Sequence, residues 1–394
     1  MIKVDNFDKT ETQTAIDLLR KLIQIPSQNG YENEYKVIKF IANLLDEINV
    51  SYKIIEIEGR ENLIATIPFG NNGPKIILNG HLDTQPAVIN LDEWEHPPFS
   101  GEIINNKIYG RGSCDMKAGV AAYLIVAKKL IQNKEDLSGT LELQFVADEE
   151  MGSNFGMKNI DKYYGLNGDL AIVAEPTQNK CCHAQLGNIW LIISLKTKES
   201  HAGYAWKASN AINHINCLLA NIENEVNQHR IMNPDKTFPY HPTLNVGKIE
   251  GGFHAGTVPG ECEAIIDIRV RPGESQEFYV SLVNEVVKNY ELLNSDIKVE
   301  INNYKTGGFP SAYLTKTDNK FYKKIIEKTN DEEGFFGFFG GSDAYYLSKN
   351  NIPTVVFGPG DLENAHMPNE YVNLDEYLKY IEMLYSFLEE VFRE

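Results

Sequence analysis

A histidine and an aspartate stand two positions apart, directly after a short apolar segment. In the motif NGHLDT, His81 and Asp83 follow the apolar residues 76–78. The imidazole of His81 can ligate a metal ion, and the Asp83 carboxylate could accept the other ring N–H and fix the tautomer. A histidine beside an aspartate is also common on protein surfaces, so this pair alone does not identify a metal site.

Four other groups of residues with metal-ligating side chains occur further along the chain. They are Asp115 in GRGSCDMKAG, Glu149 and Glu150 in ADEEMG, Glu175 in AEPT, and His366 in AHMPNE. Asp115 could simply cap the helix predicted after it, but the glycines around it also permit close approach of the backbone to a ligand. The three carboxylates 148–150 could form an exposed acidic loop, yet they repel one another unless cations are near.

The candidate ligands follow predicted strands, so they could converge at one edge of a sheet. Sites in open α/β proteins form at the carboxyl ends of the strands. Two histidines with several carboxylates suit zinc and leave open coordination positions for water and substrate. The pattern therefore predicts a zinc site built from residues far apart in the sequence.

Strands and helices alternate in the first part of the chain. Apolar residues at helical spacing predict three helices, over 15–23 (ended by Pro26), 35–45 and 116–132. Apolar runs predict strands over 52–57, 63–67, 76–78, 141–146 and 170–174. This alternation predicts an α/β domain with a mixed, mainly parallel sheet.

The pattern changes after Gly187. Strands are predicted over 189–195, 244–249, 262–270 and 297–301, and helices over 209–226 and 278–292. This β-α-β-β-α-β order describes a ferredoxin-like α+β sandwich, and polar–apolar alternation over 261–269 indicates a sheet with one wet face. The α/β pattern then resumes, with helices over 320–328 and 374–392 and a strand over 354–357. We expect a catalytic domain in two parts, residues 1–186 and 302–394, with a lid domain, residues 187–301, inserted in it.

The composition argues against several classes of partner. The 394 residues include 37 Lys+Arg against 55 Asp+Glu, a net charge of -18. Such a surface repels nucleic-acid phosphates and anionic membranes, and no apolar run is long enough to span a bilayer. The polar N-terminus shows no secretory signal, and five cysteines fit a reduced chain, so we expect a cytoplasmic protein.

Taken together, the motifs resemble one family, which comprises acetylornithine deacetylase, succinyl-diaminopimelate desuccinylase, aminoacylase and carboxypeptidase-G-type enzymes. The resemblance covers nearly the whole chain in order and spacing. Besides the motifs above, it includes WEHPPF at Trp94, SHAG at His201, IDIRVRPGE at Ile266, GGSDA at Gly340 and FGPGDLENAHMPNEYV at Phe357. The sequences RGSCDMK and AHMPNEY are most similar to those of acetylornithine deacetylase and related deacylases.

The resemblance implies a zinc-peptidase-like catalytic domain with two zinc ions per subunit, for which Co²⁺ can substitute. Asp115 would bridge the two ions. His81 and Glu175 would complete one ion, and Glu150 and His366 the other. The resemblance also implies a homodimer formed through the lid domain.

The resemblance further implies roles for residues that are not ligands. Glu149 would be the general base, and Asp83 would orient His81. His201, in the lid, would reach across the dimer to stabilise the oxyanion, and Arg269 would bind the substrate carboxylate. Together these residues would support attack of a zinc-activated water on an amide carbonyl.

Three functions remain to be compared. The first is hydrolysis of the amide bond of an N-acyl amino acid, with N-acetylornithine as the leading substrate and N-succinyl-diaminopimelate next. The second is a dipeptidase or carboxypeptidase that uses the same site. The third is a non-catalytic binding protein, against which the presence of all five ligands and Glu149 argues.

Some residues depart from the family pattern or invite other interpretations. The family often carries Pro where Ala205 stands, and Asn where Gly256 stands. Both positions lie in the part of the lid that recognises the substrate. The glycines 334, 337, 340 and 341 alternate with phenylalanines that would crowd a phosphate, so we interpret them as a hinge or pocket-wall loop. Cys181, Cys182 and His183 could imitate a metal cluster, but we interpret them as a linker near the lid hinge.

Overall fold

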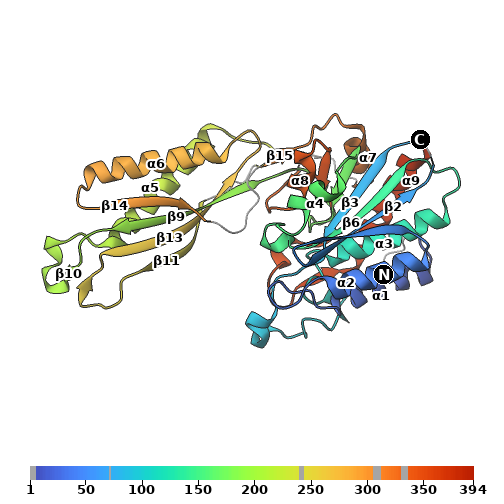
Figure 1. Ribbon diagram of the computed structural model, residues 1–394, viewed down its shortest axis with the longest axis horizontal. Helices are drawn as coiled ribbons and strands as arrows, with labels where there is room; N and C mark the ends of the chain where they lie inside the picture. Colours follow the sequence, from blue (N-terminus) through green and yellow to red (C-terminus); the bar gives the residue numbers. More distant parts are fainter. Residues whose placement is uncertain (1–5, 71, 239–243, 305–311, 330–335) are drawn as a thin grey trace. The chain divides into compact units, whose positions relative to one another are not determined.

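The chain divides into two compact units. The computed structural model describes residues 6–70, 72–238, 244–304, 312–329 and 336–394, so Gly334 lies outside the described residues. The first unit comprises Met1–Gln185 and Leu314–Glu394, and the second comprises Leu186–Tyr313 (Figure 1). The second unit is therefore inserted in the sequence of the first.

A mixed nine-stranded sheet forms the centre of the first unit. Its order is β1-β2-β6-β3-β7-β17-β8-β15, and β16 pairs with β8. The strands are β1 (Ser51–Ile57), β2 (Arg60–Pro68), β3 (Lys75–His81), β6 (Thr140–Val146), β7 (Leu170–Val173), β8 (Cys182–Gln185), β15 (Tyr313–Leu314), β16 (Phe336–Phe338) and β17 (Thr354–Val356). The neighbours β6, β3, β7 and β17 are all parallel, so their carboxyl ends lie at one edge. This sheet confirms the predicted fold class.

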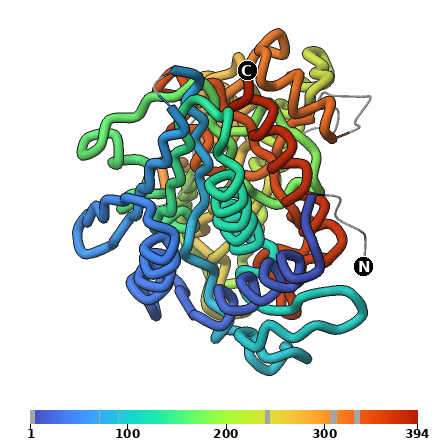
Figure 2. Tube along the Cα trace, turned by 90° about the vertical axis from the view of Figure 1, so that its right-hand side faces the viewer, coloured from blue at the N-terminus to red at the C-terminus, as the bar shows by residue number. Residues whose placement is uncertain are grey.

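Helices α1 (Lys9–Ile23), α3 (Lys117–Gln132) and α9 (Leu374–Arg393) pack against one another (Figure 2). A capping box starts α1, because the Asp8 side chain accepts from the N–H groups of Thr10 and Glu11 while Glu11 accepts from Asp8 N–H. Twelve of the 16 residues of α3 are buried, since it lies between the sheet and the other two helices. The predicted helices over 116–132 and 374–392 are thus present.

Shorter elements complete the first unit. The helices are α2 (Tyr35–Glu47), α4 (Met157–Tyr164), α7 (Lys320–Thr329) and α8 (Ala344–Lys349), with 3-10 turns η1 (Val88–Glu93), η2 (Glu149–Met151) and η4 (Leu362–Asn364). A small antiparallel sheet has the order β18-β5-β4, from Tyr371–Asn373, Lys107–Tyr109 and Glu102–Ile104. It joins the C-terminal motif around His366 to the segment before Asp115.

The interpretation of residues 181–183 as a linker is wrong. Cys182 and His183 lie on strand β8 of the central sheet and are buried. The His183 ring nitrogen Nδ1 lies 3.0 Å from the carbonyl oxygen of Thr315, to which it donates. These residues are part of the core.

The second unit is an antiparallel sheet with two helices. Its sheet order is β11-β13-β9-β14, which is the ferredoxin-like arrangement of a β-α-β-β-α-β chain. The elements are β9 (Gly187–Lys196), β10 (Ser200–His201), η3 (Ala202–Lys207), α5 (Ala211–Met232), β11 (Leu244–Gly251), β12 (Thr257–Val258), β13 (Glu261–Val270), α6 (Gln276–Leu293) and β14 (Lys298–Asn303). Burial alternates along β13, as expected for a sheet with one wet face.

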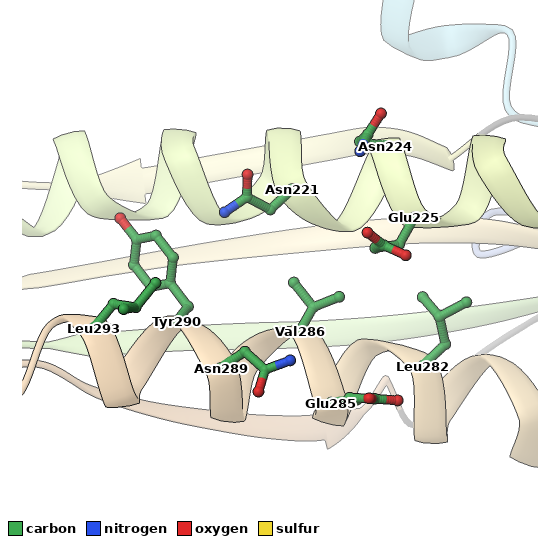
Figure 3. Close-up of a pocket in the computed structure, with 9 residues that line it drawn as sticks. All are labelled: Asn221, Asn224, Glu225, Leu282, Glu285, Val286, Asn289, Tyr290 and Leu293. Carbon is green, nitrogen blue, oxygen red and sulfur yellow. The ribbon is translucent and has the colours of Figure 1, made fainter.

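Helices α5 and α6 of the second unit leave a shallow groove between them. Its volume is about 410 Å³, and polar side chains such as Asn221, Glu225 and Glu285 share its walls with Leu282 and Tyr290 (Figure 3).

In the parts of the chain that the structure describes, no helix combines the length and the apolar character that crossing a membrane requires.

Candidate metal centre

Two groups of side chains in the first unit could each hold a metal ion. One group is His81, Asp115 and Glu175, and the other is Asp115, Glu150 and His366; within each group the ligand atoms all lie within 4.8 Å of one another. Asp115 belongs to both groups. Its Oδ1 lies 3.0 Å from His81 Nε2, and its Oδ2 lies 3.1 Å from His366 Nε2. A carboxylate with its two oxygens turned to two different groups is suited to bridging two cations.

The sheet explains how three of these side chains meet. His81 is the last residue of β3, Glu150 follows β6, and Glu175 follows β7. Because the three strands are parallel neighbours, their ends lie side by side. His366 follows β17 after the short turn η4, and reaches the same edge.

Asp115 reaches the site by another route. It directly precedes α3 and follows β5 of the small sheet, not a strand of the central sheet. The start of α3 lies very close to the end of β7, since a Cβ on Gly119 would stand 2.3 Å from the Cβ of Ala174. Glycine at position 119 therefore permits the approach of Asp115 to Glu175.

The chemistry of the donor set fits divalent cations. Glu150 Oε1 and Glu175 Oε1 are buried oxygens without a hydrogen-bond partner, although burial of an unpaired charge is costly. A cation beside each oxygen would remove that cost. Imidazole and carboxylate donors without thiolate suit zinc and similar ions. Cys114 is not a competing ligand here, because its thiol donates to the carbonyl oxygen of Asp361.

The ring of His81 is held in the orientation that a ligand needs. Its Nδ1 lies 2.9 Å from the main-chain oxygen of Asp83, which can only accept, so Nδ1 carries the proton and Nε2 faces Asp115. The Asp83 carboxylate lies further from this ring, at 3.7 Å. Its oxygens instead accept from the main-chain N–H groups of Glu149 and Glu150, each at 3.1 Å.

Burial and neighbouring charges shift the pKa values of the site residues. Burial, the largest influence, raises the pKa of Glu149 and of Glu175 well above the usual value of 4.5. Burial alone would lower the pKa of His366, but hydrogen bonds to Asp115 and Glu150 raise it to about 11. A bound cation would oppose protonation of all these groups, because it favours the ionised carboxylates and the neutral imidazole.

Glu149 stands beside the metal-competent groups without belonging to either. It is buried, and its neighbour Glu150 is the member of this loop that belongs to a metal-competent group. The side chain of His366 is 49% exposed, so this part of the site is open to solvent. A buried carboxylate next to an accessible cation pair could move protons between a water molecule and a substrate.

The two predicted site residues of the second unit lie on its sheets. His201 ends β10, is exposed, and accepts from the N–H of Gly203 at 3.0 Å. Arg269 lies on β13, with Nη2 3.0 Å from Asp267 Oδ2. Neither residue belongs to the two metal-competent groups found among the described residues.

Sequence reasoning missed the residues that form hydrogen bonds to the candidate ligands and to their backbone. Glu370 accepts from the N–H groups of Cys114 and Asp115, at 2.9 and 3.1 Å, and pairs with Arg111 at 2.7 Å. Gln85 donates to Glu150 Oε2 at 2.9 Å. The sequence offered one signal for this pair, because Arg111 stands in the glycine-rich motif of Asp115 and Glu370 stands in the motif of His366.

Comparison with known proteins places this site in a family. A family model described as Peptidase family M20/M25/M40 matches residues 77–390. The chain belongs to this family. The predicted family group is therefore confirmed, and the protein is a metallo-amidohydrolase.

Individual relatives agree over almost the full length. A probable succinyl-diaminopimelate desuccinylase of Staphylococcus aureus (strain MRSA252) is 26% identical, over 93% of this chain and 95% of that relative. A tripeptidase structure from Staphylococcus aureus subsp. aureus mu50 has a TM-score of 0.73 at 20% identity, covering 97% of this chain and 99% of that one. A dinuclear metal binding M20 peptidase from Bacillus subtilis has a TM-score of 0.67 at 17% identity, covering 98% and 99%.

Proposed function

We propose that the protein hydrolyses the amide bond of a small N-acyl amino acid, with Glu149 as general base and two zinc ions held by the five ligands. The observation that carries the proposal is the position of Asp115, whose two oxygens face His81 and His366 on either side. Dinuclear hydrolases use metal ions roughly 3.5–4 Å apart to activate one water. Asp115, which both groups share, could hold two ions near each other in this way.

The chain's own residues account for the proton transfers. Two bound zinc ions would lower the pKa of a shared water molecule toward neutrality and polarise the amide carbonyl. Glu149 would accept a proton from the attacking water and return it to the nitrogen of the leaving amine. Its position favours this role, because Glu149 is buried beside the two metal-competent groups and belongs to neither. Asp83, through its main-chain oxygen, keeps Nε2 of His81 available as a ligand.

N-Acetylornithine is the leading substrate and N-succinyl-diaminopimelate the second. The second candidate is supported by the probable desuccinylase that is 26% identical to this chain. Arg269 would bind the carboxylate of either substrate. A dipeptide would offer the same amide and carboxylate, and the tripeptidase that shares the fold keeps this possibility open.

A substrate panel separates these candidates. Initial rates would be measured on N-acetylornithine, N-succinyl-diaminopimelate and several dipeptides, with Zn²⁺ or Co²⁺ added to chelated protein. We expect kcat/KM for one acylated amino acid to exceed that for the dipeptides by at least about a hundredfold, since buried polar groups discriminate strongly. Faster hydrolysis of dipeptides would show that the protein is a peptidase.

We also propose a homodimer formed through the second unit, in a reduced cytoplasmic setting. The edge strand β11 of this unit has almost all of its residues exposed, so its outer edge is available for pairing. In such a dimer, His201 of one subunit would stabilise the oxyanion at the other subunit's cations. All five cysteines lie among the described residues and none of them forms a disulfide, which is compatible with a reducing compartment.

A further inference from the structure

We propose that Asn29 is a positioning residue for the reaction, acting through the Asp83 carboxylate on the loop that carries Glu149 and Glu150. Asn29 lies outside residues 77–390, over which the family model matches. The inference rests on the proposed roles of Glu149 as general base and Glu150 as metal ligand.

The Asp83 carboxylate joins Asn29 to the loop. Its Oδ2 accepts from Asn29 Nδ2 at 2.5 Å and from the main-chain N–H of Glu150 at 3.1 Å. Its Oδ1 accepts from the main-chain N–H of Glu149 at 3.1 Å. Asp83 is only 1% exposed, so water does not compete for these acceptor positions. Hydrogen bonds to an ionised, buried acceptor are stronger than neutral ones.

The direction of the Asn29 amide is fixed by Arg60. Arg60 Nη2 donates to Asn29 Oδ1 at 2.9 Å, which turns the amide nitrogen toward Asp83. Arg60 is itself held by Glu34, to which its Nε donates at 2.7 Å and with which it forms a partly buried ion pair. Glu34 is fully buried at the start of α2. A chain of hydrogen bonds therefore runs from α2 to the loop.

The loop needs such support because its backbone adopts an uncommon conformation. Asp148, Gly152 and Ser153 have φ angles of 66°, 93° and 58°, in the left-handed region. Non-glycine residues adopt this region at a cost and remain there when surrounding contacts determine the structure. The two N–H bonds to Asp83 are contacts of this kind, placed between the left-handed residues on either side.

The arrangement predicts an effect on one cation more than on the other. Glu150 belongs to the group with Asp115 and His366, whereas the group of His81, Asp115 and Glu175 has no residue from this loop. Weaker hydrogen bonds to the loop should therefore lower the affinity for the cation at Glu150 and slow proton transfer by Glu149. A general loss of folding stability would instead lower the affinity for both cations.

The test compares Asn29→Asp and Asn29→Ala with a matched control. Asn29→Asp keeps the size of the side chain but sets a second carboxylate against Asp83, and Asn29→Ala serves if that variant does not fold. The control is Asn179→Ala, which removes another buried asparagine of the same unit, whose Nδ2 donates to the carbonyl oxygen of Glu376 at 2.9 Å. Chelated full-length proteins would be titrated with Co²⁺, and kcat, KM and melting temperature would be measured.

In the Asn29 variants we expect one of two Co²⁺ dissociation constants to rise by about 10–100-fold, as substitutions behind metal ligands typically cause. The other constant should change by less than about threefold, with kcat lowered about tenfold or more and KM little changed. Asn179→Ala should lower the melting temperature and leave both constants and kcat near wild type. Equal weakening of both sites, or no change at either, would overturn the inference.

The titration does not depend on finding a substrate. A wild-type chain that binds fewer than two Co²⁺ ions would refute the proposed function and this inference together. Two sites in the wild type that stay unchanged in the Asn29 variants would refute the inference alone.

Discussion

The main-chain N–H of Asp115 donates to the carboxylate of Glu370 at 3.1 Å, across 255 positions of the sequence. The other carboxylate oxygen of Glu370 pairs with Arg111 at 2.7 Å, and Arg111 Nη2 donates to the carbonyl oxygen of His366 at 3.2 Å. One buried ion pair therefore holds the backbone of Asp115 and of His366, two proposed ligands of the same cation. Breaking the pair should disturb both ligands at once.

Glu370→Gln tests this relationship. The amide keeps the shape of the side chain but leaves Arg111 as a buried charge without a counter-ion, which typically costs about 3–5 kcal/mol of unfolding free energy. We expect a loss of this order in urea unfolding, together with weaker Co²⁺ binding. Glu250→Gln is a suitable control, because its ion pair with Lys248 is exposed and should contribute nothing measurable. Equal stability of the two variants would contradict the importance of the buried pair.

The neighbours Glu149 and Glu150 should respond differently to the same substitution. Glu149→Gln removes a base but no ligand, so kcat should fall by about 10²–10⁴-fold while two metal ions are retained. Glu150→Gln removes a ligand of the group with Asp115 and His366, so one of the two ions should be lost. Metal content by elemental analysis and kcat on the best substrate of the panel measure both effects. Activity that survives in Glu149→Gln would show that another group is the base.

The sequence was sufficient to predict the elements that bring the ligands together. The apolar runs 76–78, 141–146 and 170–174 became β3, β6 and β7, since short buried parallel strands are continuous in apolar residues. His81, Glu150 and Glu175 follow these strands, so their convergence could be inferred from parallel pairing alone. Strand β8 was missed because His183 and Gln185 interrupt its apolar pattern, and their polar side chains are satisfied by partners remote in sequence, such as Thr315.

The supporting contacts could not be predicted in the same way. Asn29 and Asp83 are 54 positions apart, and Glu370 and Asp115 are 255 apart, so no local spacing relates them. The role of Asp83 illustrates the limit. Its position two residues after His81 suggests a bond from the ring to the carboxylate, but the ring lies nearer to the main-chain oxygen. The carboxylate instead accepts hydrogen bonds from the N–H groups of Glu149 and Glu150, which only the folded chain brings near.

Asp343 should make the stability of the metal-free protein depend on pH. Burial raises the pKa of its carboxyl from 3.8 to about 7, and its Oδ1 accepts from the hydroxyl of Ser153. Between about pH 4 and pH 7 the folded chain therefore keeps a proton that the unfolded chain releases, so the stabilisation is complete below pH 4 and is lost as the pH rises to 7. Asp343→Asn carries no charge at any of these pH values. We therefore compare the free energy of unfolding of the variant with that of wild type at each pH. This difference should favour the variant more at pH 8 than at pH 4, by on the order of 2–4 kcal/mol. Urea unfolding of chelated protein at several pH values measures this, and a difference that does not vary with pH would refute it.

The proposed action of His201 across a dimer can be tested with two inactive variants. His201→Ala lacks the oxyanion donor, and Glu149→Gln lacks the base, so each homodimer should be nearly inactive. In a mixed dimer the subunit with intact Glu149 would receive His201 from its partner, which restores one complete site. Random mixing of coexpressed chains makes half of the dimers mixed, so activity should return to about one quarter of wild type for a two-fold symmetric dimer.

Absence of any recovery in proven mixed dimers would show that His201 acts within its own subunit or not at all. The control replaces His201→Ala by Glu150→Gln, which alters the same first unit as Glu149→Gln. Mixed dimers of these two variants contain no complete first unit, so no activity should return whichever subunit supplies His201. Recovery in the first mixture and not in the second is the pattern that only an exchange of the second unit's histidine produces.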